Sequence, residues 1–340
     1  MRDRARHTPI EPGRLLELVD GFDGRRVAVF GDLLVDEFIY GEIGRVSREA
    51  PVLILNYEST EIVAGGAGNA ASNVAALGGR PVLIGLAGRD EAGRQLLSVL
   101  RRMNLTGVAR PAGYRTPTKS RILAGGIHSA RQQVVRIDRA SPSPSAASHQ
   151  ASVESKLLRA AGRCEAMLVS DYGTGLVSPP LVARARKVMA RGAPLLVDSR
   201  YSLLRFRGMT TCTPNESEVE QLFGVKIGEN LRVLERAGRE LLERTRARAV
   251  LVTRGSRGMA LFEPQTPTVH IPISGSDQIA DVTGAGDTVI ATMTLALAAG
   301  ATFEEAAHLA NYAGGIVVTK RGTATVSADE LRTAILTDLD

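Results

Sequence analysis

Short runs of apolar, β-branched residues alternate along this chain with longer stretches in which apolar positions recur every three or four residues. The short runs predict buried strands, and the longer stretches predict amphipathic helices. The predicted strands are 27–31, 81–86, 166–170, 194–198 and 249–253, and the predicted helices are 91–103, 152–162, 179–191 and 231–244. This alternation is typical of an α/β domain whose mostly parallel sheet is covered by helices on both faces. Ligands of such sheets bind where strands end, so the loops that follow strands are the first places to search for chemistry.

Two regions, about residues 37–63 and 118–138, show strand-like patterns and turns but no helical periodicity. Since no helix pattern accompanies them, we predict a small β-sheet that stands off the main sheet as a lid or a dimer clasp. The polar, serine-rich stretch 141–152 is expected to be a surface connector. We therefore divide the chain into an N-terminal extension, 1–24, and one large α/β domain, 25–340.

Composition excludes several classes of protein. The chain is 44% apolar and 23% charged, as in ordinary globular proteins, which excludes a disordered or fibrous chain. Its net charge of +6 is scattered and it has no tryptophan, so we expect anionic small molecules rather than nucleic acid as partners. Cys164 and Cys212 lie far apart, which argues against a zinc site or a disulfide framework.

Neither the N-terminus nor the interior of the chain predicts a membrane segment. The N-terminus is charged and lacks the apolar core of a secretory signal. The most apolar uncharged stretch, 288–303, is shorter than the roughly 20 residues that cross a membrane. We expect a soluble, cytoplasmic protein with no membrane partner.

The first candidate site is the sequence Asp281-Val-Thr-Gly-Ala-Gly-Asp287, which opens a buried helix pattern that ends at Gly300. Small residues at 284–286 would let backbone N–H groups approach an anion at the positive end of the helix dipole. Asp287 would lie within reach of a bound hydroxyl. This combination suits phosphoryl transfer, with the carboxylate taking the proton of the attacking hydroxyl. The alternative is an ordinary helix start with a capping aspartate and flexible glycines.

A second glycine loop, Gly65-Gly-Ala-Gly-Asn69, precedes another helix of small residues. Gly65 and Gly66 would allow a polyol to approach, and Asn69 offers a donor and an acceptor for sugar hydroxyls. The rival interpretation is a dinucleotide motif, because 66–71 matches GxGxxA and Asp90 follows downstream. That motif belongs after the first strand of a main sheet, whereas the residues before Gly65 have the character of the lid.

Further polar residues follow predicted strands. Asp32 could accept hydrogen bonds from two sugar hydroxyls, or could cap the next turn. Asn215 and Glu218 lie one helical turn apart, where they could orient hydrated Mg²⁺ beside ATP phosphates or could simply form a capping box. The glycine turn 253–258 suits a nucleotide pocket lined by backbone.

Together these motifs resemble the PfkB (ribokinase-like) family of carbohydrate kinases, in the order of that family and over about residues 25–335. The resemblance implies a three-layer α/β/α fold with a small β-sheet lid, a 25–340 kinase domain, and ATP, Mg²⁺ and a possible K⁺ as cofactors. It implies Asp287 as the base and Gly284, Ala285 and Gly286 as the anion hole. The other residues that it assigns are Asp32, Gly65, Gly66, Asn69 and Asp171 for the sugar; Asn215, Glu218, Thr253, Gly255, Gly258 and Asn311 for ATP; Asn215 and Glu218 for Mg²⁺ through water; and Asp281 and Thr283 for a monovalent cation.

Within the family, the motifs at 31–36, 45–51, 65–69, 171–173 and 320–327 look most like those of the heptose 7-phosphate kinases of ADP-heptose synthesis. Such kinases phosphorylate the C1 hydroxyl of D-glycero-β-D-manno-heptose 7-phosphate. A substrate that already carries phosphate needs cations, and the candidates on the lid are Arg48, Lys119, Arg121 and Arg136, each of which could instead be a solvated surface charge. A homodimer is expected, because strands exposed at a lid edge favour pairing.

The chain departs from the heptose pattern at three places. Thr174 stands where those kinases usually carry lysine, Ser199-Arg200 replaces Pro-Lys, and 125–130 looks like an insertion in the lid. These departures leave two alternatives open: a kinase for another sugar, sugar phosphate or nucleoside, and a catalytically silent sugar- or nucleotide-binding regulator. The nucleotidyltransferase domain fused to some heptose kinases is not expected here, so a separate protein would supply that step.

Overall fold

The computed structural model describes residues 10–125, 131–140, 147–274 and 280–338. Within these residues the main sheet consists of β1 (Arg26–Gly31), β4 (Arg80–Ile84), β7 (Ala166–Asp171), β8 (Leu195–Ser199), β9 (Thr211–Cys212), β10 (Ala249–Thr253), β11 (Met259–Phe262) and β12 (Val269–Ile271). Their order in the sheet is β12-β11-β10-β9-β8-β7-β1-β4. All neighbours from β4 to β10 pair in parallel, and β11 and β12 are antiparallel. The predicted mostly parallel sheet is therefore confirmed.

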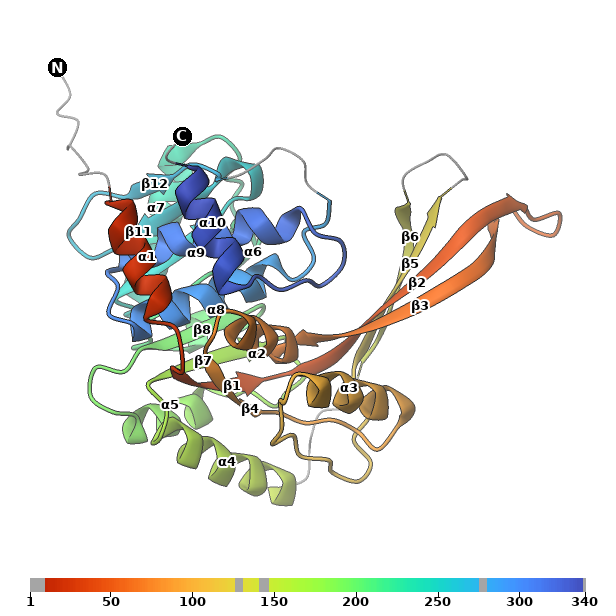
Figure 1. Cartoon of the computed structure of the whole chain (residues 1–340), viewed down its shortest axis with the longest axis horizontal. Coiled ribbons are helices and arrows are strands. Elements are labelled where there is room, and N and C mark those ends of the chain that lie inside the picture. The colour runs from red at the N-terminus through yellow and green to blue at the C-terminus, as the bar shows by residue number, and fades with distance from the viewer. Residues whose placement is uncertain (1–9, 126–130, 141–146, 275–279, 339–340) are drawn as a thin grey trace.

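Helices cover both faces of this sheet (Figure 1). On one side lie α1 (Pro12–Asp20), α2 (Ala67–Ala76), α3 (Glu91–Arg102), α8 (Ala285–Ala298), α9 (Phe303–Val318) and α10 (Ala328–Thr337), and on the other lie α4 (Ala147–Ala161), α5 (Pro179–Val188), α6 (Glu216–Phe223) and α7 (Leu231–Thr245). The side chains of β1 show how the layers form. Val27 and Val29 join the hydrophobic core on the α8 side, whereas Ala28 and Phe30 join the core on the α4 side. This alternation is the period of two that a strand imposes.

The central helix of the fold is α8, and its sequence is small or apolar on all sides. The hydroxyl groups of its buried threonines are satisfied locally, since Thr292 donates to the carbonyl of Thr288 and Thr294 donates to that of Ile290. Helices α2 and α9 pack against it, so the helix from Asp287 onward is held in the interior. Within the described residues, no helix has both the length and the apolar character needed to cross a membrane.

The predicted lid is a separate four-stranded sheet, made of β2 (Leu33–Val46), β3 (Leu53–Gly66), β5 (Thr118–Gly125) and β6 (Gln132–Arg139) in the order β3-β2-β5-β6. It extends away from the main sheet (Figure 1). Strand β2 begins directly after β1, and α2 begins directly after β3. The base of the lid therefore lies at the carboxyl end of a main-sheet strand, where the site is expected. The glycines at 65–66 end a lid strand, which removes the context that a dinucleotide motif requires.

Several elements of the structure differ from the predictions. Helix α4 begins at Ala147, so the connector predicted over 141–152 was wrong from residue 147 onward. Its first turn is polar and has no apolar periodicity, and the helix is anchored later by the buried Val153 and Leu157. Strands β9 and β12 were not predicted, because two or three residues are too few to show a pattern. The insertion proposed at 125–130 lies, apart from Gly125, outside the described residues.

The N-terminal extension contributes to the main core. Leu15, Leu18 and Val19 of α1 and the following Phe22 are buried, and α1 packs against α10. Their spacing of three, one and three residues is that of one helical face. The boundary drawn at residue 25 therefore marks where the sequence motifs begin, while the hydrophobic core already includes residues before it.

Candidate active site

Helix α8 begins with an N-terminus that no side chain of the described residues caps. Gly284 precedes it with a φ of 81°, a left-handed conformation that glycine adopts without strain. A Cβ atom at this position would lie 2.6 Å from Asn69 Nδ2, so glycine also lets the two predicted loops approach each other. The N–H groups of a first helical turn lack helical partners and carry the positive end of the dipole. This helix end can therefore bind an anion, as predicted for 284–286.

Asp287 lies in that first turn and is only 3% exposed. Asn69 donates a 2.9 Å hydrogen bond from Nδ2 to Asp287 Oδ2, and the Tyr172 hydroxyl lies 3.3 Å and 3.4 Å from the two carboxylate oxygens. Burial raises the pKa of Asp287 to about 7, although the hydrogen bonds from Asn69 and Tyr172 act in the opposite direction. A carboxyl group with this pKa exchanges its proton near neutral pH, which suits general base catalysis.

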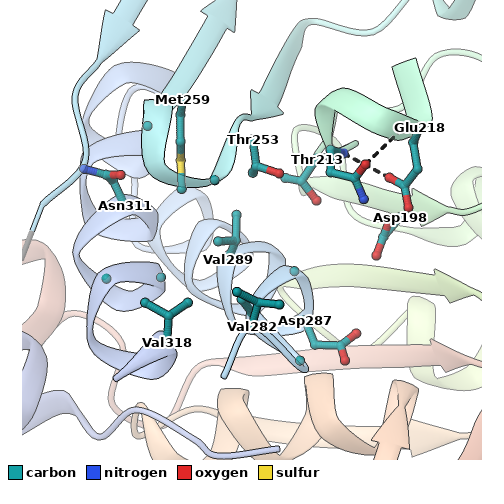
Figure 2. Close-up of a pocket in the computed structure, with 18 of the residues that line it drawn as sticks. Asp198, Thr213, Glu218, Thr253, Met259, Val282, Asp287, Val289, Asn311 and Val318 are labelled. Atoms are coloured by element: carbon teal, nitrogen blue, oxygen red, sulfur yellow. Dashed lines mark hydrogen bonds between the residues drawn. The ribbon is translucent and has the colours of Figure 1, made fainter. Parts of the chain in front are cut away.

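A pocket of about 490 Å³ opens over the first turn of α8 (Figure 2). Eleven of the predicted site residues line it: Asp171, Asn215, Glu218, Thr253, Gly255, Gly258, Gly284, Ala285, Gly286, Asp287 and Asn311. Met259, Val289 and Val318 form an apolar side, while Asp198, Glu218 and Asp287 lie toward the other side (Figure 2). A ligand with an apolar ring at one end and polar groups at the other matches this arrangement.

Asn215 and Glu218 do form the capping box that was the alternative interpretation of their spacing. Asn215 Oδ1 accepts from the Glu218 backbone N–H at 2.9 Å, and Glu218 Oε2 accepts from that of Asn215 at 2.9 Å. Both residues also line the pocket, so the two interpretations are compatible. The hydroxyl of Thr213, on the same wall, is buried and has no hydrogen-bond partner among the described residues.

Negative charge is concentrated on this wall. The pKa of Asp198 lies well above its ordinary value because of burial first, and then because of the nearby carboxylates of Glu218, Asp287 and Asp171. Arg200, an exposed residue at the pocket, opposes this rise. Among the described residues, no group of three His, Cys, Asp or Glu side chains is arranged to hold a metal ion.

Asp32 and the glycines at 65 and 66 lie just beyond the pocket lining. Asp32 Oδ1 accepts from the Thr174 hydroxyl at 2.6 Å, and Oδ2 accepts from the backbone N–H groups of Tyr172 and Thr174 at 2.8 Å and 3.1 Å. Burial raises the pKa of Asp32, and these hydrogen bonds oppose the rise. Added Cβ atoms at Gly65 and Gly66 would lie 2.2 Å from a carboxylate oxygen of Asp36 and 2.4 Å from the Asp32 carbonyl. Both glycines are therefore needed for the packing of the protein itself.

The four lid cations differ in their surroundings, and none of them lines the pocket. Lys119 lies 4.5 Å above the Tyr172 ring, and burial lowers its pKa. Arg121 forms a buried ion pair with Asp36. Arg136 forms an exposed pair with Asp138 on the same strand, as the surface-charge alternative predicted. Arg48 is exposed in the turn between β2 and β3. The strands β2 and β3 extend far from the main sheet before they reach this turn (Figure 1).

The residues expected near a monovalent cation form a local loop. Asp281 Oδ1 accepts from the Thr283 backbone N–H at 2.9 Å, and Oδ2 accepts from that of Gly322 at 3.2 Å. This carboxylate joins the start of the α8 loop to the segment that follows α9. Asp281 and Thr283 do not line the pocket, although Val282 between them does.

Eleven of the pocket residues were not assigned to the site from sequence, and three of them carry a charged or phenolic side chain: Tyr172, Asp198 and Arg200. Tyr172 directly follows β7, Asp198 is in the last two residues of β8 and Arg200 directly follows β8, so the strand-end rule indicates this region. The rule does not say which of several consecutive side chains points into the pocket. That information comes from the turn geometry, which has no clear sequence signal here.

Comparison with known proteins gives a consistent result. A match to the pfkB family of carbohydrate kinases covers residues 25–330. The bifunctional protein HldE of Caulobacter vibrioides is 40% identical over 324 residues, which cover 93% of this chain and 65% of that protein. HldE of Aeromonas hydrophila is 41% identical over 326 residues, with the same two coverages. This chain therefore spans about 65% of the length of these relatives.

Two solved structures share the fold. Phosphofructokinase-2 from Escherichia coli, in complex with potassium, superposes with a TM-score of 0.73 at 20% identity, covering 94% of this chain and 100% of that one. Ribokinase from Arabidopsis thaliana, complexed with ribose and ATP, gives a TM-score of 0.67 at 19% identity, covering 94% and 99%. At these identities the likeness shows the architecture alone.

Proposed function

Because this chain belongs to the PfkB family of carbohydrate kinases, we propose that it transfers the γ-phosphoryl group of ATP to the C1 hydroxyl of D-glycero-β-D-manno-heptose 7-phosphate. The products are the 1,7-bisphosphate and ADP. The ribokinase-like fold with a β-sheet lid, expected from the motifs, agrees with this family. The heptose substrate rests on the likeness to HldE proteins and on the motifs they share with this chain.

One observation carries the kinase proposal. Asn69 of the first glycine loop donates hydrogen bonds to both Asp287 Oδ2, at 2.9 Å, and the Gly284 carbonyl, at 3.4 Å. Two motifs that are 218 residues apart are thus joined at one end of one helix. A sugar held by the first loop would present its hydroxyl to the base and to the anion-binding N-terminus of α8 at the same time.

The chain's own residues divide the reaction between them. Asp287, when ionised, accepts the proton of the acceptor hydroxyl while an oxygen lone pair forms the new bond to the γ-phosphorus. The bond between that phosphorus and the ADP oxygen breaks, and ADP retains the electron pair. Backbone N–H groups at 284–286 hydrogen-bond the transferred oxygens and stabilise the charge that they carry in the transition state.

The acidic wall of the pocket fits Mg²⁺ bound together with ATP. Asn215 and Glu218 would hold it through water, since Mg²⁺ usually keeps several waters and takes few direct protein ligands. Thr213, whose buried hydroxyl has no hydrogen-bond partner among the described residues, lines the same pocket. The carboxylates whose mutual repulsion raises the pKa of Asp198 would also gain from a nearby cation. When bound, Mg²⁺ neutralises part of the phosphate charge.

The proposed site for a monovalent cation, with K⁺ as the first candidate, lies beside Asp281 and Thr283. The carboxylate of Asp281 fixes the loop that leads into α8, so a cation here would stiffen the anion-binding turn. E. coli phosphofructokinase-2 has been solved in complex with potassium.

Lys119 is the first candidate among the lid cations for the 7-phosphate of the substrate. It has no ion pair among those identified in the described residues, and it lies against Tyr172 at the pocket. Arg121 is neutralised by Asp36 and Arg136 by Asp138. Arg200 provides a second cation at the pocket itself.

The lid also supports a homodimer. Among the described residues, eight of its large apolar side chains are exposed: Ile43, Val46, Val52, Leu53, Tyr57, Val134, Val135 and Ile137. A second copy of the chain would cover this surface. Sedimentation velocity over a range of concentrations tests the dimer, and a monomer throughout the range would contradict it.

A panel of acceptors tests the substrate. We expect ADP release with Mg²⁺-ATP and the heptose 7-phosphate to exceed that with ribose, fructose 6-phosphate or adenosine by at least about tenfold in kcat/KM. The product should carry its new phosphate on C1 by ³¹P NMR. If a neutral sugar or a nucleoside turned over faster than the heptose 7-phosphate, the heptose assignment would be wrong and that compound would be the acceptor. Tight ATP binding without turnover of any acceptor would favour the silent regulator instead.

A further inference from the structure

Tyr172 lies at a meeting point of three parts of the fold. It follows β7 directly, its hydroxyl approaches both oxygens of Asp287 on α8, and the Lys119 ammonium of the lid strand β5 lies 4.5 Å from its ring centre. Its ring also borders Gly66 at the end of β3, where an added Cβ would lie 3.4 Å from Tyr172 Cδ2. The side chain therefore contacts the base, the sugar loop and the lid at once.

The backbone of the loop that carries Tyr172 is held in place by hydrogen bonds to Asp32. The Asp32 carboxylate accepts hydrogen bonds from the N–H of Tyr172 and from both the N–H and the hydroxyl of Thr174. Gly173 between them adopts a φ of 80°, and a Cβ there would lie 2.8 Å from the Tyr201 ring. A loop anchored at both sides of a tight turn keeps the phenol in one place. Asp32 thereby acts on the site through Tyr172.

We propose that Tyr172 is a positioning residue for the base: its hydroxyl orients the Asp287 carboxylate in the resting enzyme and yields that place to the acceptor hydroxyl of the substrate. This inference rests on the proposed kinase function. The distances support exchange, because the two contacts of 3.3 Å and 3.4 Å are longer than the 2.9 Å bond from Asn69. Asn69 fixes one carboxylate oxygen, while the phenol is shared weakly between both.

The charges around Asp287 agree with a donor role for the phenol. The nearby Asp36 carboxylate disfavours the charged form of Asp287 and so raises its pKa, whereas the Lys119 ammonium favours the charged form. The pKa of Tyr172 lies well above its ordinary value because of burial and nearby carboxylates. The phenol therefore stays protonated over the working range of pH and donates to the carboxylate.

The test compares Tyr172→Phe with the wild type in two measurements. The first is the titration of Asp287 by ¹³C NMR of labelled aspartate carboxyl groups, with its resonance assigned by its loss in Asp287→Asn. The second is the pH dependence of kcat/KM. Removing the donor should raise the pKa of Asp287, and with it the acid limb of the profile, by roughly half to one pH unit.

Tyr201→Phe is the matched control, because Tyr201 is a neighbouring, 61% exposed tyrosine that does not line the pocket. It should leave both titrations unchanged. An unmoved Asp287 titration and acid limb in Tyr172→Phe would overturn the inference, even if the rate fell. The NMR titration does not depend on turnover. If the wild type phosphorylates no acceptor, the proposed function is refuted. The NMR titration would still test whether Tyr172 donates to Asp287.

Discussion

The buried carboxyl group of Asp287 links activity to stability at the scale of a single residue. Its pKa is raised from 3.8 to about 7 by burial. Between these two values the folded chain keeps a proton that the unfolded chain has released. Stability is therefore lost as the pH rises through this window, and the full cost of the buried charge is present above pH 7. The form of Asp287 that can accept a proton is the form that destabilises the fold.

Replacing Asp287 with asparagine should consequently stabilise the protein, and more so at high pH. The amide cannot ionise, and its oxygen can still accept from Asn69. We expect the free energy of unfolding of Asp287→Asn to exceed that of the wild type by about 1–3 kcal/mol more at pH 8 than at pH 5. Urea denaturation at the two pH values measures this difference.

Asp329→Asn is the control for that experiment, since the Asp329 side chain is 92% exposed. Its effect should be the same at both pH values. A stability difference between Asp287→Asn and the wild type that is the same at pH 5 and pH 8 would contradict a raised pKa in the folded state.

Where a motif and a helix start coincide, as at Asp287, Asn215 and Glu218, the residues singled out from sequence line the pocket. Sequence motifs were less informative where function depends on which way a turn points, as at Tyr172 and Asp198. They also could not show that Arg121 is neutralised by Asp36, because that pair joins strands 85 residues apart. Whether a basic residue is available to a ligand depends on such partners.

At the scale of elements, the predicted strands and helices of the main domain are present, because their apolar periodicity matches their burial. Helix α4 was predicted too short, since its polar first turn carries no such signal. Helix α1 was not predicted, because it is only nine residues long and shows few apolar positions, although its buried face has regular helical spacing. The lid was predicted from the lack of helical pattern, and its strand order required the structure.

The paired strands β5 and β6 offer an element-scale test of the lid. Arg121 on β5 and Arg136 on β6 are direct cross-strand neighbours. Arg121→Met leaves Asp36 buried without its partner and should lower the free energy of unfolding by about 2–4 kcal/mol. Arg136→Met removes only an exposed pair and should cost less than about 1 kcal/mol.

Urea denaturation of both variants checks the comparison, and Asp36→Asn combined with Arg121→Met should recover part of the loss. Equal effects of the two single substitutions would show that the Arg121 pair is no more buried in solution than that of Arg136.

At the scale of the whole molecule, the site exists because α2 and α8 pack side by side. This contact brings residues 65–69 and 281–287 together over the carboxyl ends of the central strands. No local pattern predicts such a long-range contact. It was expected from the family resemblance, because members of one family share the whole fold and therefore its long-range contacts. The lid strands β2 and β3 also begin and end beside residues 65–69, so the proposed sugar-binding loop lies at the base of the lid.

The central claim is that Asp287 removes the acceptor proton at an anion-binding helix end. Single-turnover transfer from γ-labelled ATP to the heptose 7-phosphate, measured in the wild type and in Asp287→Asn, tests it most directly. The account predicts a fall in rate of about 10²–10⁴-fold with ATP affinity nearly unchanged by calorimetry. A rate close to that of the wild type would contradict it.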